Sequence, residues 1–119
     1  MADDITYVEL GPRYSQAVVH GGLVYLCGQV GPPNASITEQ TEGALANIDR
    51  LLVLSGSDKS RILQVTVWLT DMKHWAEMTA AYEKWIPQGA VPARASVGSA
   101  LVPNYDVEIM LTAAQHPSL

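Results

Sequence analysis

Apolar and polar residues alternate along several short segments of the chain, while two longer segments repeat at helical spacing. Residues 5–10 are mixed apolar and polar and predict a first strand. Two segments rich in β-forming residues, 17–20 and 23–26, flank Gly21 and Gly22. Paired glycines between two such segments are typical of a tight hairpin. The N-terminal part of the chain therefore predicts three strands.

A capped helix is predicted next. Ser36 stands three residues before Glu39, which is the spacing of a capping box. Apolar residues then recur at intervals of three and four, as on the buried face of a helix, and Gly56 is expected to end it. These apolar residues are Ile37, Ala44, Leu45, Ile48, Leu51 and Leu52.

A strand is predicted over residues 62–70, where apolar and polar residues alternate. Its core-facing side is expected to carry Leu63, Val65, Val67 and Leu69. Asp71 is placed to cap a second helix, which has a stripe of large apolar residues at spacings of three, four and three. The stripe is Trp75, Met78, Tyr82 and Trp85, and it is interpreted as core or interface packing.

Two further strands are predicted over residues 93–100 and 105–114. The order β-β-β-α-β-α-β-β predicts an α+β fold, a sheet with both helices on one face, in a single domain over residues 1–119. The opposite face would carry Trp68 and Met110, which are too apolar to remain exposed. An oligomer that covers this face is therefore expected.

Composition narrows the classes of function. Seven basic against twelve acidic residues give a net charge of −5, and 48% of residues are hydrophobic. This acidic balance disfavours nucleic-acid binding, which needs clustered cations. No segment approaches the roughly 18 apolar residues of a membrane span.

The N-terminal segment and the single cysteine favour a cytoplasmic protein, and the positions of the histidines give no sign of a metal site. The N-terminus has neither the basic nor the apolar region of a signal peptide, and Cys27 is the only cysteine. His20, His74 and His116 are far apart along the chain and show no ligand spacing with Cys27. No metal site is expected, and the histidines are interpreted as surface residues.

Several segments, in order along nearly the whole chain, form a specific set of motifs. They are RYSQAV (13–18), VYLCGQV (24–30), residues 40–48, Gly56-Ser57, VTVWLTDM (65–72), PARAS (92–96) and VEI (107–109). Each match is weak alone, but the ordered set is highly specific. Together these segments resemble the RidA/YjgF family of reactive-intermediate deaminases.

The resemblance implies a chorismate-mutase-like α+β subunit that assembles as a homotrimer, with ligand clefts between subunits. It also implies hydrolysis of imines and enamines, of the 2-iminobutanoate and 2-iminopropanoate type, to 2-ketoacids and ammonia. The family uses no cofactor or metal for this reaction. A small imino or keto acid is thus the expected ligand.

Arg94 is the strongest candidate site residue, because a guanidinium matches a carboxylate with two parallel hydrogen bonds. Taken alone, such an arginine is more often exposed or ion-paired. The resemblance assigns Arg94 to the substrate carboxylate and Tyr14 to the cleft, although Tyr14 is equally consistent with interface packing. It also assigns ligand-facing backbone groups to Gly28 and Ser96, and a bulge or a crowded crossing of strands would equally explain Gly28.

The chain departs from the family pattern at Met110, where many of these deaminases have a glutamate that is thought to position water. Glu108 lies on the same face of the strand and could replace it as a catalytic residue, or be a solvated or paired surface acid. Cys27 stands where the family often has serine. It is interpreted as a small buried residue or, alternatively, as an oxidisable thiol.

Three alternative functions stay open. The first is deamination of an aminated ring-cleavage acid such as 2-aminomuconate, with Arg13 as a second cation. The second is non-catalytic binding of small carboxylates, which Met110 favours. The third, a chaperone or translation inhibitor, has been suggested for family relatives, but the acidic charge argues against direct action on RNA.

Overall fold

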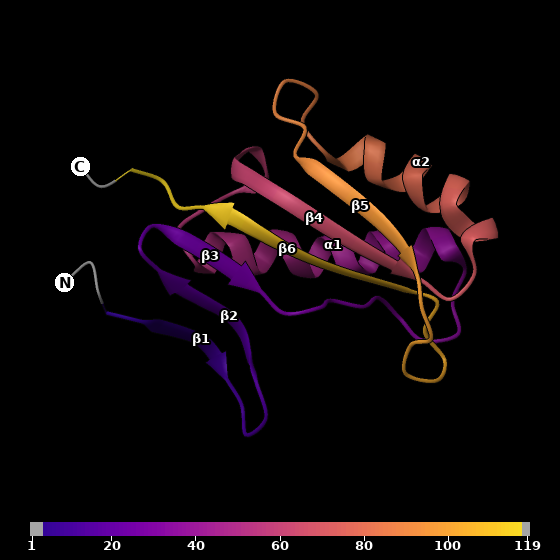
Figure 1. The fold of residues 1–119 in the computed structure, drawn as a ribbon, viewed down its shortest axis with the longest axis horizontal. Coiled ribbons are helices and arrows are strands. Elements are labelled where there is room, and N and C mark those ends of the chain that lie inside the picture. The colour runs from indigo at the N-terminus through magenta and orange to yellow at the C-terminus, as the bar shows by residue number, and fades with distance from the viewer. Residues whose placement is uncertain (1–3, 118–119) are drawn as a thin grey trace.

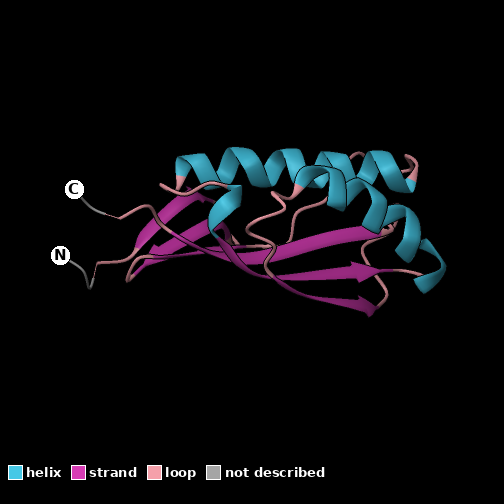
Figure 2. Ribbon diagram, turned by 90° about the horizontal axis from the view of Figure 1, so that it is seen from above, coloured by secondary structure: helices cyan, strands magenta, loops and turns pink. Residues whose placement is uncertain are grey.

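One six-stranded sheet organises the protein in a computed structural model that describes residues 4–117. The strand order is β1-β2-β3-β6-β4-β5, antiparallel except for the parallel pair β4 and β5. Both helices cover the same face of the sheet (Figures 1 and 2), which confirms the predicted α+β fold and element order. The elements are β1 (Thr6–Leu10), β2 (Ser15–His20), β3 (Leu23–Leu26), α1 (Ile37–Leu54), β4 (Ile62–Leu69), α2 (Trp75–Trp85), β5 (Ala93–Gly98) and β6 (Val107–Ala114).

The turns and caps form where the local sequence favours them. Gly21 and Gly22 both adopt positive φ in the turn between β2 and β3, a conformation that suits glycine. At the start of α1, the Ser36 hydroxyl accepts a hydrogen bond from the backbone N–H of Glu39 at 3.1 Å, and the Glu39 carboxylate accepts one from the backbone N–H of Ser36. Gly56 has φ of +79° just beyond the helix end. The capping box and the hairpin are confirmed.

Asp71 caps a different element from the one predicted. Its carboxylate accepts a hydrogen bond from the backbone N–H of Lys73 at 2.9 Å and begins a short 3₁₀ helix, Met72–His74. Helix α2 follows directly at Trp75, without a side-chain cap.

The hydrophobic core lies between the two helices and the sheet. All six apolar residues of the predicted face of α1 are buried, as are Met78 and Tyr82 of α2. Alternate residues of each central strand complete the core. They include Val24, Leu26, Val65, Val67, Leu69, Val107, Ile109 and Leu111.

One core prediction in β4 is wrong. Leu63 is 49% exposed, and the buried residue at this end of the strand is Ile62. The pairing of β4 with β6 shifts register between Ile62 and Gln64, so an extra residue is accommodated by a bulge. The expected alternation holds only beyond this point, from Val65 onward.

The face of the sheet away from the helices, termed the open face, carries apolar side chains on adjacent strands. Tyr25, Val97 and Met110 are exposed, and Trp68 is half-buried.

Within the described residues, no helix is long and apolar enough to cross a membrane.

Helix α1 also fixes the start of β6. The buried Gln40 side chain accepts a hydrogen bond from the backbone N–H of Asp106 at 2.8 Å. The Thr70 hydroxyl donates to the Asp106 carboxylate at 2.6 Å. The residues that enter β6, Glu108 among them, are thereby held in a set position.

We predict that Gly31→Ala destabilises the protein by about 1–3 kcal/mol, because a Cβ there would overpack against α1. That atom would lie 2.8 Å from the backbone carbonyl carbon of Gln40, which cannot move without shifting the helix. Chemical denaturation would measure the free energy of unfolding. Gly89→Ala is the matched control, since nothing lies within 4 Å of its Cβ position. Equal stability of the two variants would contradict the prediction.

Candidate functional site

Arg94 lies in a groove between the edge strand β5 and helix α2. Its Nη2 donates a hydrogen bond to the Thr79 hydroxyl at 3.1 Å. Its guanidinium carbon lies over two aromatic rings, 4.8 Å from the ring centroid of Tyr82 and 5.6 Å from that of Trp75. The guanidinium is therefore held by one hydrogen bond and two cation–π contacts.

The local sequence explains this arrangement. Residues 75, 79 and 82 are spaced by four and three, so they share one face of α2. Arg94 is paired in the parallel ladder with Val65, which is buried beneath the helices. Its side chain therefore projects from the helix-covered side of the sheet, at an edge where β5 has no further strand beyond it.

The charge of Arg94 is not neutralised within the described part of the chain, where it forms no ion pair. A guanidinium has five N–H donors, and Thr79 takes only one of them. The groove around it has a volume of about 870 Å³ and is also lined by Ile86, Val91 and Pro92. A half-buried, unpaired cation in a largely apolar groove is suited to bind a small carboxylate.

Tyr82 forms the inner wall of this groove. Burial raises the pKa of its phenol, and the positive charge of Arg94 opposes that rise. Its hydroxyl is buried and has no hydrogen-bond partner among the described residues. The ring consequently acts as a neutral aromatic surface beneath the guanidinium.

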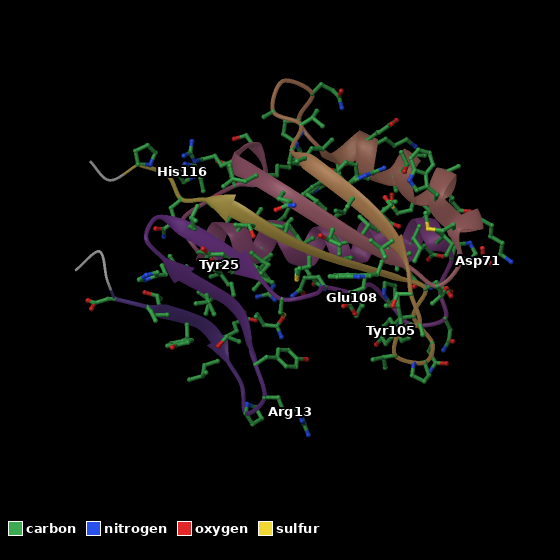
Figure 3. All side chains as sticks on the ribbon, viewed as in Figure 1. Arg13, Tyr25, Asp71, Tyr105, Glu108 and His116 are labelled. Carbon is green, nitrogen blue, oxygen red and sulfur yellow. The ribbon has the colours of Figure 1, made fainter. Side chains whose placement is uncertain are left out.

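A second group of predicted site residues, Glu108 and Gly28, lies on the open face. Glu108 (Figure 3) is half-buried on β6. In the sheet it is paired with Trp68 of β4. A Cβ added at Gly28 would lie 2.8 Å from the carboxyl carbon of Glu108. The absence of a side chain at Gly28 therefore allows the carboxylate to approach the backbone.

Cys27 lies beside this pair in a small polar network. Its thiol donates to the Gln16 side-chain carbonyl at 3.3 Å, and the Gln29 amide donates to the same oxygen at 2.9 Å. Burial raises the pKa of the Cys27 thiol, and the negative charge of Glu108 raises it further, against the lowering effect of the Gln29 hydrogen bond. Half-burial supports the interpretation as a small packed residue, although Cys27 is not fully enclosed.

One chain does not bring all the predicted site residues together. Arg94 and Ser96 lie on β5, on the helix side, whereas Glu108 and Gly28 lie on the open face. Tyr14 is exposed in the turn between β1 and β2, and three strands separate β2 from β5. Arg13, at the tip of the same turn, is equally far from Arg94 in the sheet order (Figure 3).

Sequence reasoning missed Thr79 as the partner of Arg94, and it gave Trp75 and Tyr82 no role beside that residue. The apolar stripe was interpreted as packing, which is correct for Met78 and Tyr82. Trp75, however, is 43% exposed. The spacing of residues 75, 79 and 82 predicts that they share one face of a helix. It does not predict that Arg94 packs against that face.

The described residues contain no cluster of three or more histidine, cysteine or acidic side chains that could hold a metal ion. His116 lies 3.1 Å from the Asp58 carboxylate. His20 and His116 are exposed, whereas His74 is half-buried.

Fold and site together define a small α+β protein with a groove that presents an unpaired arginine. A family profile described as Endoribonuclease L-PSP matches residues 8–115. A RutC family protein of Haemophilus ducreyi is 38% identical over 112 residues, covering 92% of this chain and 96% of the relative. The RutC family protein YoaB of Escherichia coli is 37% identical over 111 residues, with 92% and 97% coverage.

Solved structures agree with these matches. A crystal structure of a YjgF family member from Neisseria meningitidis superimposes with a TM-score of 0.96 at 40% identity, over 99% of this chain and all of that one. Yeast Mmf1 gives a TM-score of 0.88 at 32% identity, over 95% of this chain and all of its own. The chain belongs to the RidA/YjgF family, which includes the RutC and Endoribonuclease L-PSP proteins.

We predict that Cys27 reacts with iodoacetamide at pH 8 more slowly than free cysteine does, because its raised pKa leaves less of the reactive thiolate. Glu108→Gln removes a negative charge that raises this pKa, so the variant should react faster than the wild type at the same pH. Mass spectrometry of the alkylated chain would give both rates. Denatured protein, which should react like free cysteine, serves as the control. A native rate equal to the denatured rate would contradict the prediction.

Proposed function

We propose that this protein hydrolyses 2-imino acids and their enamine tautomers to 2-ketoacids and ammonia. The observation that carries the proposal is the unpaired Arg94 guanidinium, held by Thr79 and two aromatic rings in a groove of suitable size. Family membership supports it, since many members of this family are imine and enamine deaminases. The small-molecule ligand implied by the family fits the same groove.

The proposed reaction needs little beyond positioning and electrostatic stabilisation. Arg94 binds the substrate carboxylate through two N–H donors, which fixes the C=N bond relative to the protein. The oxygen of a water molecule then bonds to the imine carbon, and the nitrogen accepts a proton. The remaining hydroxyl proton of this adduct passes to the nitrogen as the C–N bond breaks, so that the ketone forms and ammonia leaves.

We propose a homotrimer as the active form. Two observations support association: the apolar side chains of the open face, and the separation of Tyr14 from Arg94 within one chain. In the proposed assembly, Tyr14 of one copy lies over the Arg94 groove of the next and contacts the plane of the imine. Backbone groups of Gly28 and Ser96 complete the ligand contacts.

Glu108 is the proposed residue that orients water. Because it lies on the open face and Arg94 on the helix side, the two would act on one substrate across the interface between copies. Its close approach to Gly28 and its half-buried position support this role, because a partly desolvated carboxylate is a strong hydrogen-bond acceptor. Met110, which replaces the family glutamate, is 39% exposed on the same face and has no group that could bind water in this way.

Two alternatives use the same groove. Non-catalytic binding of 2-ketoacids is favoured by Met110. Deamination of a conjugated dicarboxylate would use Arg13, which precedes Tyr14 in the same turn and would reach a neighbouring groove with it. The family description as an endoribonuclease carries less weight for this chain, because its net charge of −5 opposes binding to a polyanion. Cytoplasmic action is our proposal, although one yeast relative is named as mitochondrial.

We predict that Arg94→Ala lowers kcat/KM for imine hydrolysis by about 100-fold or more, because charge-assisted hydrogen bonds to the carboxylate are lost. An amino-acid oxidase would produce 2-imino acids in the reaction mixture. Trapping with semicarbazide would report how long each imine survives.

Glu108→Gln, in the same assay, should lower kcat and leave KM nearly unchanged if the carboxylate only orients water.

The matched control for this experiment is Lys73→Ala, which removes one cation at an exposed position. It should retain wild-type activity. If wild type and Arg94→Ala both leave the imine lifetime equal to that in buffer, the deaminase proposal is wrong. Calorimetric titration with pyruvate would then test the non-catalytic alternative on the same two proteins.

We predict a native mass of three times the 12.8 kDa of one chain, measured by light scattering after size-exclusion chromatography. Val97→Glu places a charge in the apolar open face and should shift the mass toward that of one chain, because an unpaired charge is costly to bury. Glu42→Gln is an exposed change on α1, away from both the open face and the Arg94 groove, and should leave the mass unaltered. A wild-type mass of one chain would overturn the proposed trimer.

A further inference from the structure

Trp75 is unusual among the large side chains of α2. Met78 and Tyr82, on the same helix, are almost fully buried, whereas Trp75 is 43% exposed at the first position of the helix. It nevertheless lies beside the unpaired cation of the groove, with its ring centroid 5.6 Å from the guanidinium carbon of Arg94. An exposed indole next to a ligand-binding cation is a candidate contact for the ligand itself.

The distance places Trp75 within reach of a bound substrate. If a carboxylate binds to Arg94, the side chain of a 2-imino acid begins at the adjacent carbon. Because the exposed indole is in contact with the guanidinium, a leucine or phenylalanine side chain of an acid bound to Arg94 would reach the indole surface. The single methyl group of an alanine-derived imine would cover little of that surface.

Other apolar side chains line the groove at the end of α2 opposite Trp75. Ile86 follows the end of α2, and Val91 and Pro92 lead into β5, and all three line the groove. Glu83 and Lys84 also line it and contribute charges of opposite sign. The part of the groove that would receive the substrate side chain is therefore largely apolar, and the charges of Glu83 and Lys84 cancel.

We propose that Trp75 determines substrate choice and favours 2-imino acids with large apolar or aromatic side chains. This inference rests on the proposed function, because it assumes that the carboxylate of the substrate binds to Arg94. Stacking or packing on the indole removes apolar surface of the substrate from water, and the gain grows with the size of the side chain.

A different role for Trp75 gives a different result. If the indole only holds the Arg94 guanidinium through its cation–π contact, its loss should weaken binding of every carboxylate by the same factor. If it also contacts the substrate side chain, its loss should weaken large substrates by a larger factor than small ones. The ratio between substrates therefore separates the two roles.

The experiment compares imines derived from alanine, leucine and phenylalanine with wild type, Trp75→Ala and Trp75→Phe. We expect wild type to favour the phenylalanine imine over the alanine imine in kcat/KM. Trp75→Ala should lower kcat/KM for both imines, because the cation–π contact with Arg94 is lost, and should lower it about tenfold more for the phenylalanine imine than for the alanine imine. Trp75→Phe should restore most of the preference, since it keeps an aromatic surface.

Binding of stable ketoacids gives a second readout that does not need turnover. Calorimetric titration should show tighter binding of phenylpyruvate than of pyruvate, with the difference reduced in Trp75→Ala. An equal loss for both ligands, or an unchanged preference, would overturn the inference even if imine hydrolysis is confirmed. Absence of hydrolysis by wild type would instead overturn the proposed function. The difference in affinity between phenylpyruvate and pyruvate, in wild type and in Trp75→Ala, would then decide the role of Trp75.

Discussion

The packing of α1 against the sheet is the constraint on which the other features depend. Its apolar face supplies Ile48, Leu51 and Leu52 to the centre of the core. The same helix ties the start of β6 through Gln40, and so sets the position of Glu108. Close approach of the loop at Gly31 to the backbone of α1 leaves no room for a side chain there. One helix therefore determines both the core and one part of the candidate site.

Helix α1 also positions α2, and through it Arg94. Near one end, the Thr38 hydroxyl donates to the Glu77 carboxylate at 2.9 Å. Near the other, the Trp85 indole N–H donates to the Asp49 carboxylate at 2.9 Å. With both ends tied, the face of α2 that carries Thr79 is held over β5. The orientation of Arg94 thus follows from contacts distributed along two helices rather than from its immediate neighbours in sequence.

Local patterns predicted most of the elements, because their causes are local. The capping box at Ser36, the glycine turn after β2 and the buried face of α1 all depend on residues within a few positions of one another. The exposure of Leu63 was not predictable in this way. It depends on a register shift against β6, a strand more than forty residues further along the chain.

In the candidate site, too, local sequence predicted some features, while contacts between distant segments determined the others. Residue chemistry and family resemblance identified Arg94, but its contacts with Thr79, Tyr82 and Trp75 depend on how α2 crosses the edge strand. The sheet order, which sets Tyr14 far from Arg94, arises because β6 inserts between β3 and β4. Neither alternation nor helical spacing contains that information. Long-range pairing decides it, and such pairing leaves only weak traces in a single sequence.

In the proposed trimer, the separation of Tyr14 from Arg94 within one chain links substrate binding to assembly. A groove that holds only the carboxylate end of a substrate provides orientation at one end and leaves the reacting carbon open to solvent. A second copy that covers this groove would exclude water in bulk and strengthen every electrostatic contact inside it. Burial of the exposed aromatic and aliphatic side chains of the open face favours the proposed association. In that arrangement, the same association of copies buries the apolar open face and completes the candidate site.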